Sequence, residues 1–212
     1  MLIDFHSHVL PGMDDGAKDL ATSLMMLGEM QRQGIALVMA TSHFYLIENS
    51  IAEFLDRRNT AYRHLMAGAD ASGAVIPPVR LGAEVHLTKG LSAEPDLAKL
   101  CLEGTRCLLL ELPFASWPGW VVDAVGEIRS RGISPILAHV ERQAGYPGNE
   151  DLIARLLAMD LAVQINAESI LSREEQRFCL KLIKNGVTVV LGSDTHNLSS
   201  RPARLKEAAG VI

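Results

Sequence analysis

The chain has 212 residues, of which 48% are hydrophobic and 21% are charged, and its formal net charge is −5. This composition is typical of a globular protein and excludes a disordered or collagen-like chain. The acidic balance argues against nucleic acid as the main partner, and no uncharged apolar run is long enough for membrane insertion. We therefore expect one domain over residues 1–212, and the composition indicates no particular oligomeric state.

The N-terminal residues and the cysteines indicate where the protein resides. The sequence opens on MLIDFHSH, which has acid and histidine where a signal peptide needs a basic start and an apolar core. The three cysteines, Cys101, Cys107 and Cys179, are odd in number and widely spaced, which favours a reducing compartment over a disulfide framework. We expect a cytoplasmic protein.

Short apolar runs alternate with amphipathic segments along the whole chain. In chain order the pattern predicts strand 2–5, helix 19–33, strand 35–40, helix 50–71, strands 79–83 and 107–110, helix 120–131, strand 136–138, helix 151–159, strand 161–165, helix 172–184 and strand 187–191. A capping box of Ser172 and Glu175 is expected to open the last helix. This alternation predicts an α/β fold with a parallel sheet covered by helices.

Acidic and histidine side chains stand at the carboxyl ends of the predicted strands. They are His6, His8, His43, Glu84, Glu111, His139, Asp194 and His196. In a parallel sheet these ends face one side, where ligands bind. A closed barrel gathers them around one mouth, whereas an open doubly wound sheet would place them along a line. We therefore predict a closed, TIM-like barrel.

The histidines and acids have the spacing of metal ligands. His6 and His8 lie two positions apart on a strand and so point to the same side, and Asp194 and His196 repeat that spacing. One histidine alone is more often a core or loop residue than a ligand. Five of the seven histidines at strand ends, together with acids, instead predict a metal site.

Two other histidines stay outside the predicted ligand set, because His64 falls within helix 50–71 and His86 follows Glu84 by two positions. Imidazole and carboxylate ligands without thiolate suit zinc, iron or manganese rather than calcium or magnesium alone. Because the ligands exceed the needs of one ion, we expect two or three divalent ions with bridging carboxylates. Such a positive centre suits a phosphate dianion and acidifies a water that attacks at neutral pH.

Phosphate ester hydrolysis follows more naturally from this charge than amide hydrolysis. Arg142, three residues after His139, and Arg201, five after His196, are candidate clamps for phosphate oxygens, although either could instead form a surface ion pair. The sequence lacks the cysteine-to-arginine spacing of a cysteine phosphatase, and it has no G-x-x-x-x-G-K-[ST] or G-x-S-x-G motif. Asp14, in GMDDG, is expected to be an ordinary turn residue.

A series of motifs resembles one protein superfamily. They are D-F-H-S-H, D-D-G, T-S-H, G-A-E, L-E-L-P, A-H-V-E-R, Q-I-N-A and S-D-T-H-N followed by R-P, and they span nearly the whole chain. Their order resembles the PHP (polymerase and histidinol phosphatase) superfamily. It is more closely similar to the bacterial manganese-dependent protein-tyrosine phosphatases encoded with capsule and exopolysaccharide genes. The resemblance implies a distorted (β/α)7 barrel with a trinuclear metal centre, most often of manganese, with iron or zinc as alternatives.

Carried over by motif, the resemblance implies ligands for each ion. The first ion would take His6, His8, Glu84 and Asp194, the second Asp15, His43 and His196, and the third Glu111 and His139, with Glu84 bridging. Other branches of the superfamily often have histidine in place of Glu111, so this residue favours the tyrosine-phosphatase branch. One departure follows His43, where relatives have a polar loop and this chain has the apolar run FYLI at 44–47.

The resemblance further implies hydrolysis of phosphotyrosine by a metal-bound hydroxide, with Asp194 or His196 able to shuttle a proton. The protein substrate that it implies is a bacterial tyrosine kinase that governs polysaccharide export. The apolar run at 44–47 keeps open a second hypothesis, a small-molecule phosphomonoesterase such as histidinol phosphatase. A third hypothesis is a non-catalytic metal-binding regulator.

Overall fold

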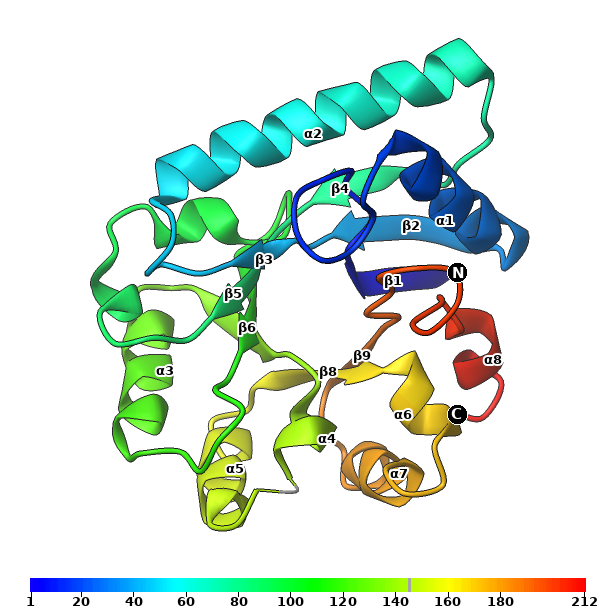
Figure 1. Cartoon of the computed structure of the whole chain (residues 1–212). Helices are drawn as coiled ribbons and strands as arrows, with labels where there is room; N and C mark the ends of the chain where they lie inside the picture. The colour runs from blue at the N-terminus through cyan, green and yellow to red at the C-terminus, as the bar shows by residue number, and fades with distance from the viewer. Residues whose placement is uncertain (145) are drawn as a thin grey trace.

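The computed structural model describes residues 1–144 and 146–212, and it shows a parallel sheet surrounded by helices (Figure 1). The strands are β1 (Leu2–Ser7), β2 (Ile35–Ala40), β3 (His43–Phe44), β4 (Val79–Leu81), β5 (Glu84–His86), β6 (Cys107–Glu111), β7 (Ser134–Leu137), β8 (Ala162–Asn166) and β9 (Val189–Gly192). The longer helices are α1 (Leu20–Arg32), α2 (Ile51–Ser72), α3 (Trp120–Ser130), α5 (Asn149–Leu157) and α7 (Gln176–Lys184). The shorter ones are α4 (Val140–Gln143), α6 (Ala167–Leu171), α8 (Leu205–Ala209) and the 3-10 turns η1 (Leu91–Ala93) and η2 (Leu97–Leu100). The predicted α/β class is therefore confirmed.

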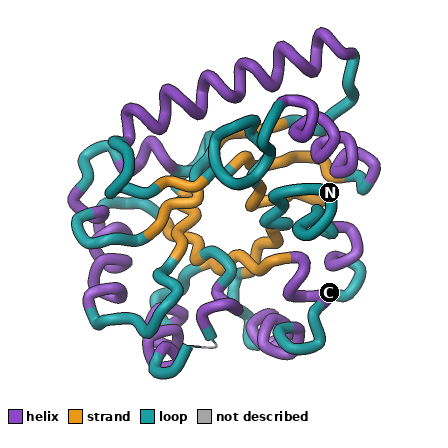
Figure 2. Tube along the Cα trace, viewed as in Figure 1, coloured by secondary structure: helices purple, strands orange, loops and turns teal. Residues whose placement is uncertain are grey.

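The pairings between these strands are parallel and fall into two groups. One group has the order β1-β2-β4 and the other β3-β5-β6-β7-β8-β9. The chain joins the groups because β2 leads into β3 and β4 leads into β5, and a bridge between Ser7 and Thr195 ties the end of β1 to the segment after β9. The strands consequently curl around a common centre, with the helices on the outside (Figure 2).

Two predicted strands are each followed, after a gap of two residues, by a short second strand. The run at 35–40 is followed by a separate strand β3, and the run at 79–83 ends at residue 81 and is followed by β5. The backbone N–H of Glu84 donates to the carbonyl oxygens of both Thr41 and Ser42, each at 3.1 Å. The register is the same on both sides of the gap, because Ala40 pairs with Leu81 and His43 pairs with Glu84. The second pair of short strands thereby places two of the predicted ligands side by side.

The predicted capping box of Ser172 and Glu175 is wrong. Residues 167–171 already form α6, so Ser172 terminates that helix, and α7 begins only at Gln176 without a side-chain cap bond. A capping box forms instead at the start of α2, where the Ser50 hydroxyl accepts from the N–H of Glu53 and the Glu53 carboxylate accepts from the N–H of Ser50. The prediction failed because it did not include the short helix α6.

Two apolar clusters stabilise the fold. The larger lies between the strands and the surrounding helices. The smaller is formed by residues of the strands and their adjoining segments: Met39, Leu102, Leu109, Ile136 and Ala138. The three cysteines are unpaired. No helix in the described part of the chain combines the length and the apolar character that crossing a bilayer requires.

Candidate metal centre

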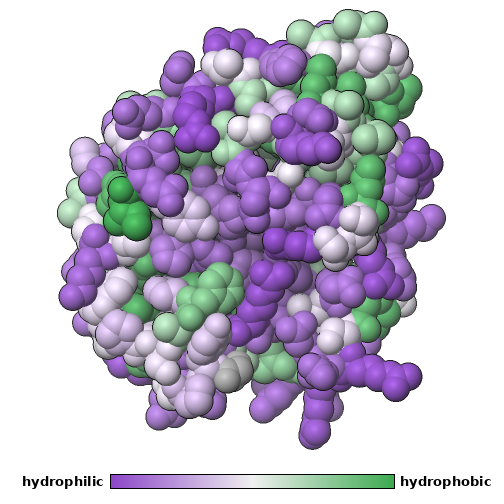
Figure 3. All heavy atoms as spheres, viewed as in Figure 1, coloured by the Kyte–Doolittle hydropathy of each residue, from purple (hydrophilic) through white to green (hydrophobic). Residues whose placement is uncertain are grey.

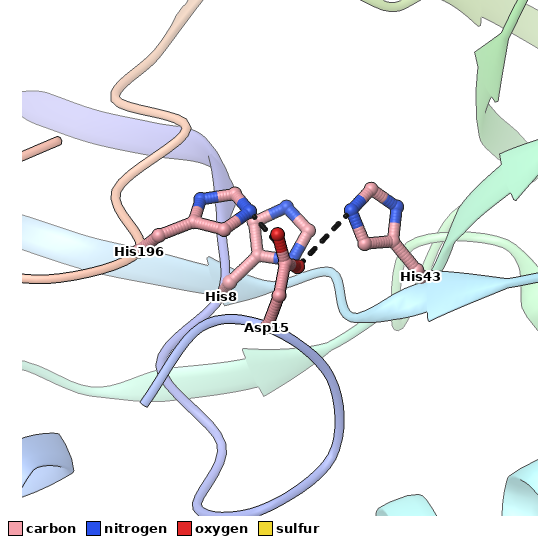
Figure 4. A group of neighbouring side chains, drawn as sticks. All are labelled: His8, Asp15, His43 and His196. Carbon is pink, nitrogen blue, oxygen red and sulfur yellow. Dashed lines mark ion pairs between the residues drawn. The ribbon is translucent and has the colours of Figure 1, made fainter. Parts of the chain in front are cut away.

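The nine side chains predicted as ligands lie in one cluster at the carboxyl ends of the strands. Their nitrogen and oxygen atoms form four groups, and the atoms within each group lie within 4.8 Å of one another. The groups are His8, Asp15, His43 and His196; His6, His8 and Asp194; His6, Glu84 and His139; and His43, Glu84 and Glu111. Figure 4 shows the first group, whose side chains come from segments far apart in the sequence and point towards one another. The shared members join the four groups into a single cluster.

Glu84, the first residue of β5, is the central member. Its Oε2 lies 3.0 Å from His6 Nε2, 3.3 Å from His8 Nε2 and 3.0 Å from His43 Nδ1, and its Oε1 lies 2.7 Å from His139 Nε2. The side chain is only 1% exposed, yet Oε2 makes no hydrogen bond to any residue that the structure describes. A buried carboxylate oxygen surrounded by ring nitrogens, but without a hydrogen bond, is suited to coordinate cations.

Three histidines of the cluster have their Nδ1 atoms fixed by oxygen atoms. His6 Nδ1 lies 2.8 Å from Gln164 Oε1, His8 Nδ1 lies 2.8 Å from Asp14 Oδ2, and His196 Nδ1 lies 2.9 Å from the carbonyl oxygen of Asp194. Because these oxygens only accept, each Nδ1 carries the hydrogen, and in the neutral ring that binds a metal each Nε2 presents its lone pair to the cluster. Histidines that coordinate metals in proteins are held in this way.

Asp14 and Gln164 are site residues that the sequence reasoning missed. The Asp14 carboxylate is not merely part of a turn, because it accepts from His8 and also, at 3.0 Å, from the backbone N–H of His43. Burial tends to raise the pKa of Asp14, but the bond to His8, the charge of His8 and the backbone bonds from Gly16 and His43 together outweigh burial and hold that pKa well below its usual range. Gln164 Oε1 also accepts from the backbone N–H of His139, at 3.0 Å. The sequence offered only their positions as a clue, because Asp14 stands beside a predicted ligand and Gln164 near the end of a predicted strand.

Two strand-end residues adopt a left-handed backbone. The φ angle is 31° at His139 and 51° at Asp194. Residues other than glycine seldom adopt such angles, which cost about 1–3 kcal/mol and concentrate at functional sites. The turn at His139 directs its Nε2 to Glu84, and the N–H of Asp194 donates to the carbonyl oxygen of His6 at 2.8 Å. Both side chains therefore extend into the cluster from strained backbone positions.

Arg142 and Arg201, the predicted phosphate clamps, reach the cluster through Asp194. Arg142 Nη2 lies 3.2 Å and Arg201 Nη2 lies 2.7 Å from Asp194 Oδ2, and both arginine side chains are about one-third exposed. Asn166 Nδ2 donates to the same oxygen at 3.0 Å. Asp194 Oδ1 faces the ring nitrogens of the cluster instead, at 3.4 to 3.5 Å. One carboxylate thus contacts the candidate ligands with one oxygen and holds both arginines with the other.

The buried charges favour cations in the cluster. Burial lowers the pKa of His6, but the carboxylates of Glu84 and Asp194 outweigh burial and raise it to about 9. Conversely, burial raises the pKa of both carboxylates, but the histidines outweigh it and hold both well below their usual range. The Nε2 atoms of His6 and His8 are 3.1 Å apart, so two protonated rings would repel each other. Divalent ions fit this set of imidazole and carboxylate donors, which is typical of manganese, iron or zinc sites.

His86 contacts the cluster without belonging to any candidate group. Its Nδ1 lies 2.8 Å from Glu111 Oε2, while Glu111 Oε1 lies 3.6 Å from His139 Nε2. On the outer side, Asp15 is 66% exposed, so the cluster opens to solvent beside it. The face that Figure 3 shows is mostly hydrophilic, with apolar residues in separate groups.

The apolar run at 44–47 does not act as one surface. Phe44 is buried and its ring packs against Phe54, with ring centroids 5.3 Å apart. Tyr45 turns towards the cluster, and its ring centroid lies 5.5 Å from that of His43. Ile47 is 82% exposed. Leu46 packs against the larger apolar cluster, so Tyr45 is the residue of this run whose ring lies beside the candidate metal centre.

The profile of a family described as "Capsular polysaccharide synthesis, CpsB/CapC" matches residues 2–212. The chain belongs to the CpsB/CapC family. It is 31% identical to the tyrosine-protein phosphatase YwqE of Bacillus subtilis (strain 168), covering 100% of this chain and 84% of that one. It is also 31% identical to the tyrosine-protein phosphatase CpsB of Streptococcus pneumoniae, covering 100% and 89%.

A solved structure is similar over almost the whole fold. It comes from a study of B. subtilis YwqE and S. pneumoniae CpsB, described as unique metal-dependent tyrosine phosphatases. The TM-score is 0.83 at 28% sequence identity, and the match covers 99% of this chain and 85% of the other. The resemblance to the capsule-type bacterial phosphatases, which the sequence motifs indicated, is thus confirmed.

Proposed function

We propose that this protein is a metal-dependent phosphatase that hydrolyses phosphotyrosine in proteins. The observation that carries the proposal is the convergence of nine imidazole and carboxylate side chains, whose donor atoms lie within 4.8 Å of one another in each group. Membership in the CpsB/CapC family and 31% identity with two tyrosine-protein phosphatases support phosphotyrosine as the substrate.

The proposal assigns the nine side chains to two or three divalent ions, with manganese preferred over iron and zinc. His6, His8, Glu84 and Asp194 would hold the first ion, Asp15, His43 and His196 the second, and Glu111 and His139 the third, with Glu84 shared. When bound, such ions supply positive charge to phosphate oxygens and lower the pKa of a water nucleophile. The fixed Nδ1 atoms and the buried Glu84 oxygen without a hydrogen bond support this assignment.

The two arginines bind the phosphate in this proposal. Arg142 and Arg201 are anchored on Asp194 Oδ2, so their guanidinium groups are held at the cluster before a substrate arrives. Asp194 acts as an ionised anchor, because its neighbouring histidines outweigh burial and hold its pKa well below the usual range. Phenolate is a good leaving group, and any proton that it takes up comes from solvent, because His196 Nδ1 donates to the carbonyl oxygen of Asp194 and its Nε2 is assigned to an ion.

Three finer points belong to the same proposal. The sheet forms a distorted (β/α)7 barrel of the PHP type, in one domain over residues 1–212, with β2–β3 and β4–β5 each counted as one interrupted strand. The protein substrate is a bacterial tyrosine kinase of polysaccharide export, in keeping with a capsule-synthesis family. The location is cytoplasmic, which the three unpaired cysteines support.

Release of phosphate from a phosphotyrosine peptide tests the proposal. We expect the purified protein to lose activity after chelation and to regain it when manganese is added back. His8→Ala removes a member of two candidate groups and abolishes activity, whereas the control His64→Ala, on the exposed side of α2, keeps it.

Assays on other substrates separate the remaining hypotheses. Turnover of histidinol phosphate without turnover of the peptide would contradict the proposal and favour a small-molecule phosphatase. Manganese binding without phosphate release from the peptide, histidinol phosphate or p-nitrophenyl phosphate would instead favour a non-catalytic regulator.

A further inference from the structure

An exposed aromatic ring stands beside the candidate metal centre. Phe114 lies three residues after the end of β6 and is 43% exposed. Its ring stacks on that of His139, with centroids 5.5 Å apart and planes inclined by 20°. Among the large apolar residues that the described chain leaves exposed, Phe114 is the only aromatic one. An exposed phenylalanine over a buried polar cluster is suited to contact a ligand.

A second aromatic ring, that of Tyr45, lies near the carboxylate of Glu84, on the side of β3. Its centroid lies 5.5 Å from that of His43, and His43 Nδ1 lies 3.0 Å from Glu84 Oε2. On the other oxygen, Glu84 Oε1 lies 2.7 Å from the Nε2 of His139, which Phe114 covers. The two rings therefore lie against histidines that contact different oxygens of Glu84.

The positively charged clamps lie at another part of the cluster. Arg142 and Arg201 contact Asp194 and make no ion pair with Glu84 or Glu111 in the described part of the chain. The cluster thus has guanidinium groups on Asp194 and aromatic rings against His43 and His139, the histidines that contact Glu84. A ligand with an anionic head and an aromatic body complements this arrangement.

The chemistry of an aryl phosphate places its ring within reach of such residues. In a phenyl ester a single oxygen joins phosphorus to the ring, so the ring lies against the wall of whatever site holds the phosphate. An alkyl ester has a tetrahedral carbon at that position and presents no π face. Aromatic rings gain from stacked or edge-to-face contacts, beyond the burial of their area.

We propose that Phe114 and Tyr45 bind the phenyl ring of the substrate and thereby select aryl over alkyl phosphate esters. This inference rests on the proposed phosphatase function and adds to it the residues that recognise the leaving group. It also gives a role to Tyr45, which is part of the apolar run that departs from the usual polar loop.

The binding of two phosphonates, neither of which can be hydrolysed, tests the inference. Phenylphosphonate and methylphosphonate share a head group and differ in the ring, and calorimetry on the manganese-loaded protein compares them at a pH where both are dianions. We expect the wild type to bind phenylphosphonate more tightly. Phe114→Leu keeps apolar bulk without the π face. It weakens the binding of phenylphosphonate about fivefold, the equivalent of roughly 1 kcal/mol. Methylphosphonate affinity changes by less than about twofold.

Tyr45 variants separate the ring from its hydroxyl group. Tyr45→Leu selectively weakens the binding of phenylphosphonate, as Phe114→Leu does. Tyr45→Phe retains the preference for phenylphosphonate over methylphosphonate. Ile47→Ala, in the same loop but 82% exposed, is the control and leaves both affinities unchanged.

Equal affinity of the wild type for the two phosphonates would overturn the inference. So would an unchanged ratio of affinities in both leucine variants, or a parallel loss for both ligands, which would show only a disturbed cluster. Failure of the proposed function is detected separately, as absence of phosphate release from a phosphotyrosine peptide by the wild type. The phosphonate comparison does not depend on that release.

Discussion

Asp14→Asn isolates the carboxylate that holds His8 in place. Asp14 Oδ2 lies 2.8 Å from His8 Nδ1 and 3.0 Å from the backbone nitrogen of His43, and Oδ1 accepts from the N–H of Gly16 at 3.0 Å. Asparagine has one accepting oxygen, so its amide nitrogen must face either the first two donors or Gly16. In both orientations the negative charge that strengthens the bond from His8 is lost.

The loss of this charge weakens metal binding, and the size of the effect follows from the difference between a charged and a neutral hydrogen bond. A hydrogen bond to a charged group contributes about 1.5–3 kcal/mol, against about 0.5–1.5 kcal/mol between neutral groups. A difference of roughly 1.5 kcal/mol corresponds to about tenfold in a dissociation constant. That value agrees with the effect of removing partners of metal-bound histidines elsewhere. We therefore expect Asp14→Asn to raise the manganese dissociation constant about tenfold, measured by titration calorimetry.

Asp56→Asn makes the same chemical change at an exposed position of α2 and serves as the control. Its manganese affinity should equal that of the wild type. If Asp14→Asn has the wild-type melting temperature and also binds manganese with wild-type affinity, then Asp14 does not orient His8. The bond to His8 Nδ1 would then not contribute to metal binding.

Two further substitutions test the fold around the site. Ser50→Ala removes the capping box of α2 and lowers the free energy of unfolding by about 1 kcal/mol in urea titrations, whereas Ser172→Ala, which removes no cap bond, has little effect. An equal effect of the two serine variants would contradict the cap assignment. Gly192→Ala places a Cβ in steric conflict with the Cβ of His6, so it lowers the melting temperature and weakens manganese binding. Gly126→Ala, whose Cβ meets open space within α3, should do neither. A Gly192→Ala protein with the melting temperature and manganese affinity of the wild type would refute the close packing of β9 on β1.

The strands were predictable where an apolar run is continuous. The run at 35–40 forms β2 with the predicted bounds, because its side chains are apolar enough to be buried in a parallel sheet. The short strands β3 and β5 were not predicted as separate elements. Their existence depends on the pairing of Glu84 with His43, which lie far apart in the sequence. Pairing between distant segments leaves no local pattern to recognise.

The candidate ligands were more predictable than the residues that support them. His6 and His8 carry a spacing that follows from strand geometry, and the parallel topology brings the other strand ends to the same place. Asp14 and Gln164 have no comparable signature, because an acid in a turn or an amide in a strand is ordinary until its partner is known. Their hydrogen bonds depend on tertiary contacts, as does the ion pair of Arg142 with Asp194.

The most direct test of the metal centre is anomalous diffraction from crystals of the manganese-loaded protein. We expect strong peaks among the side chains around Glu84, within coordination distance of His6, His8 and Asp194 on one side and of His43 and His196 on the other. A map without anomalous density in this cluster, from protein that binds manganese in solution, would contradict the assignment of these side chains as its ligands.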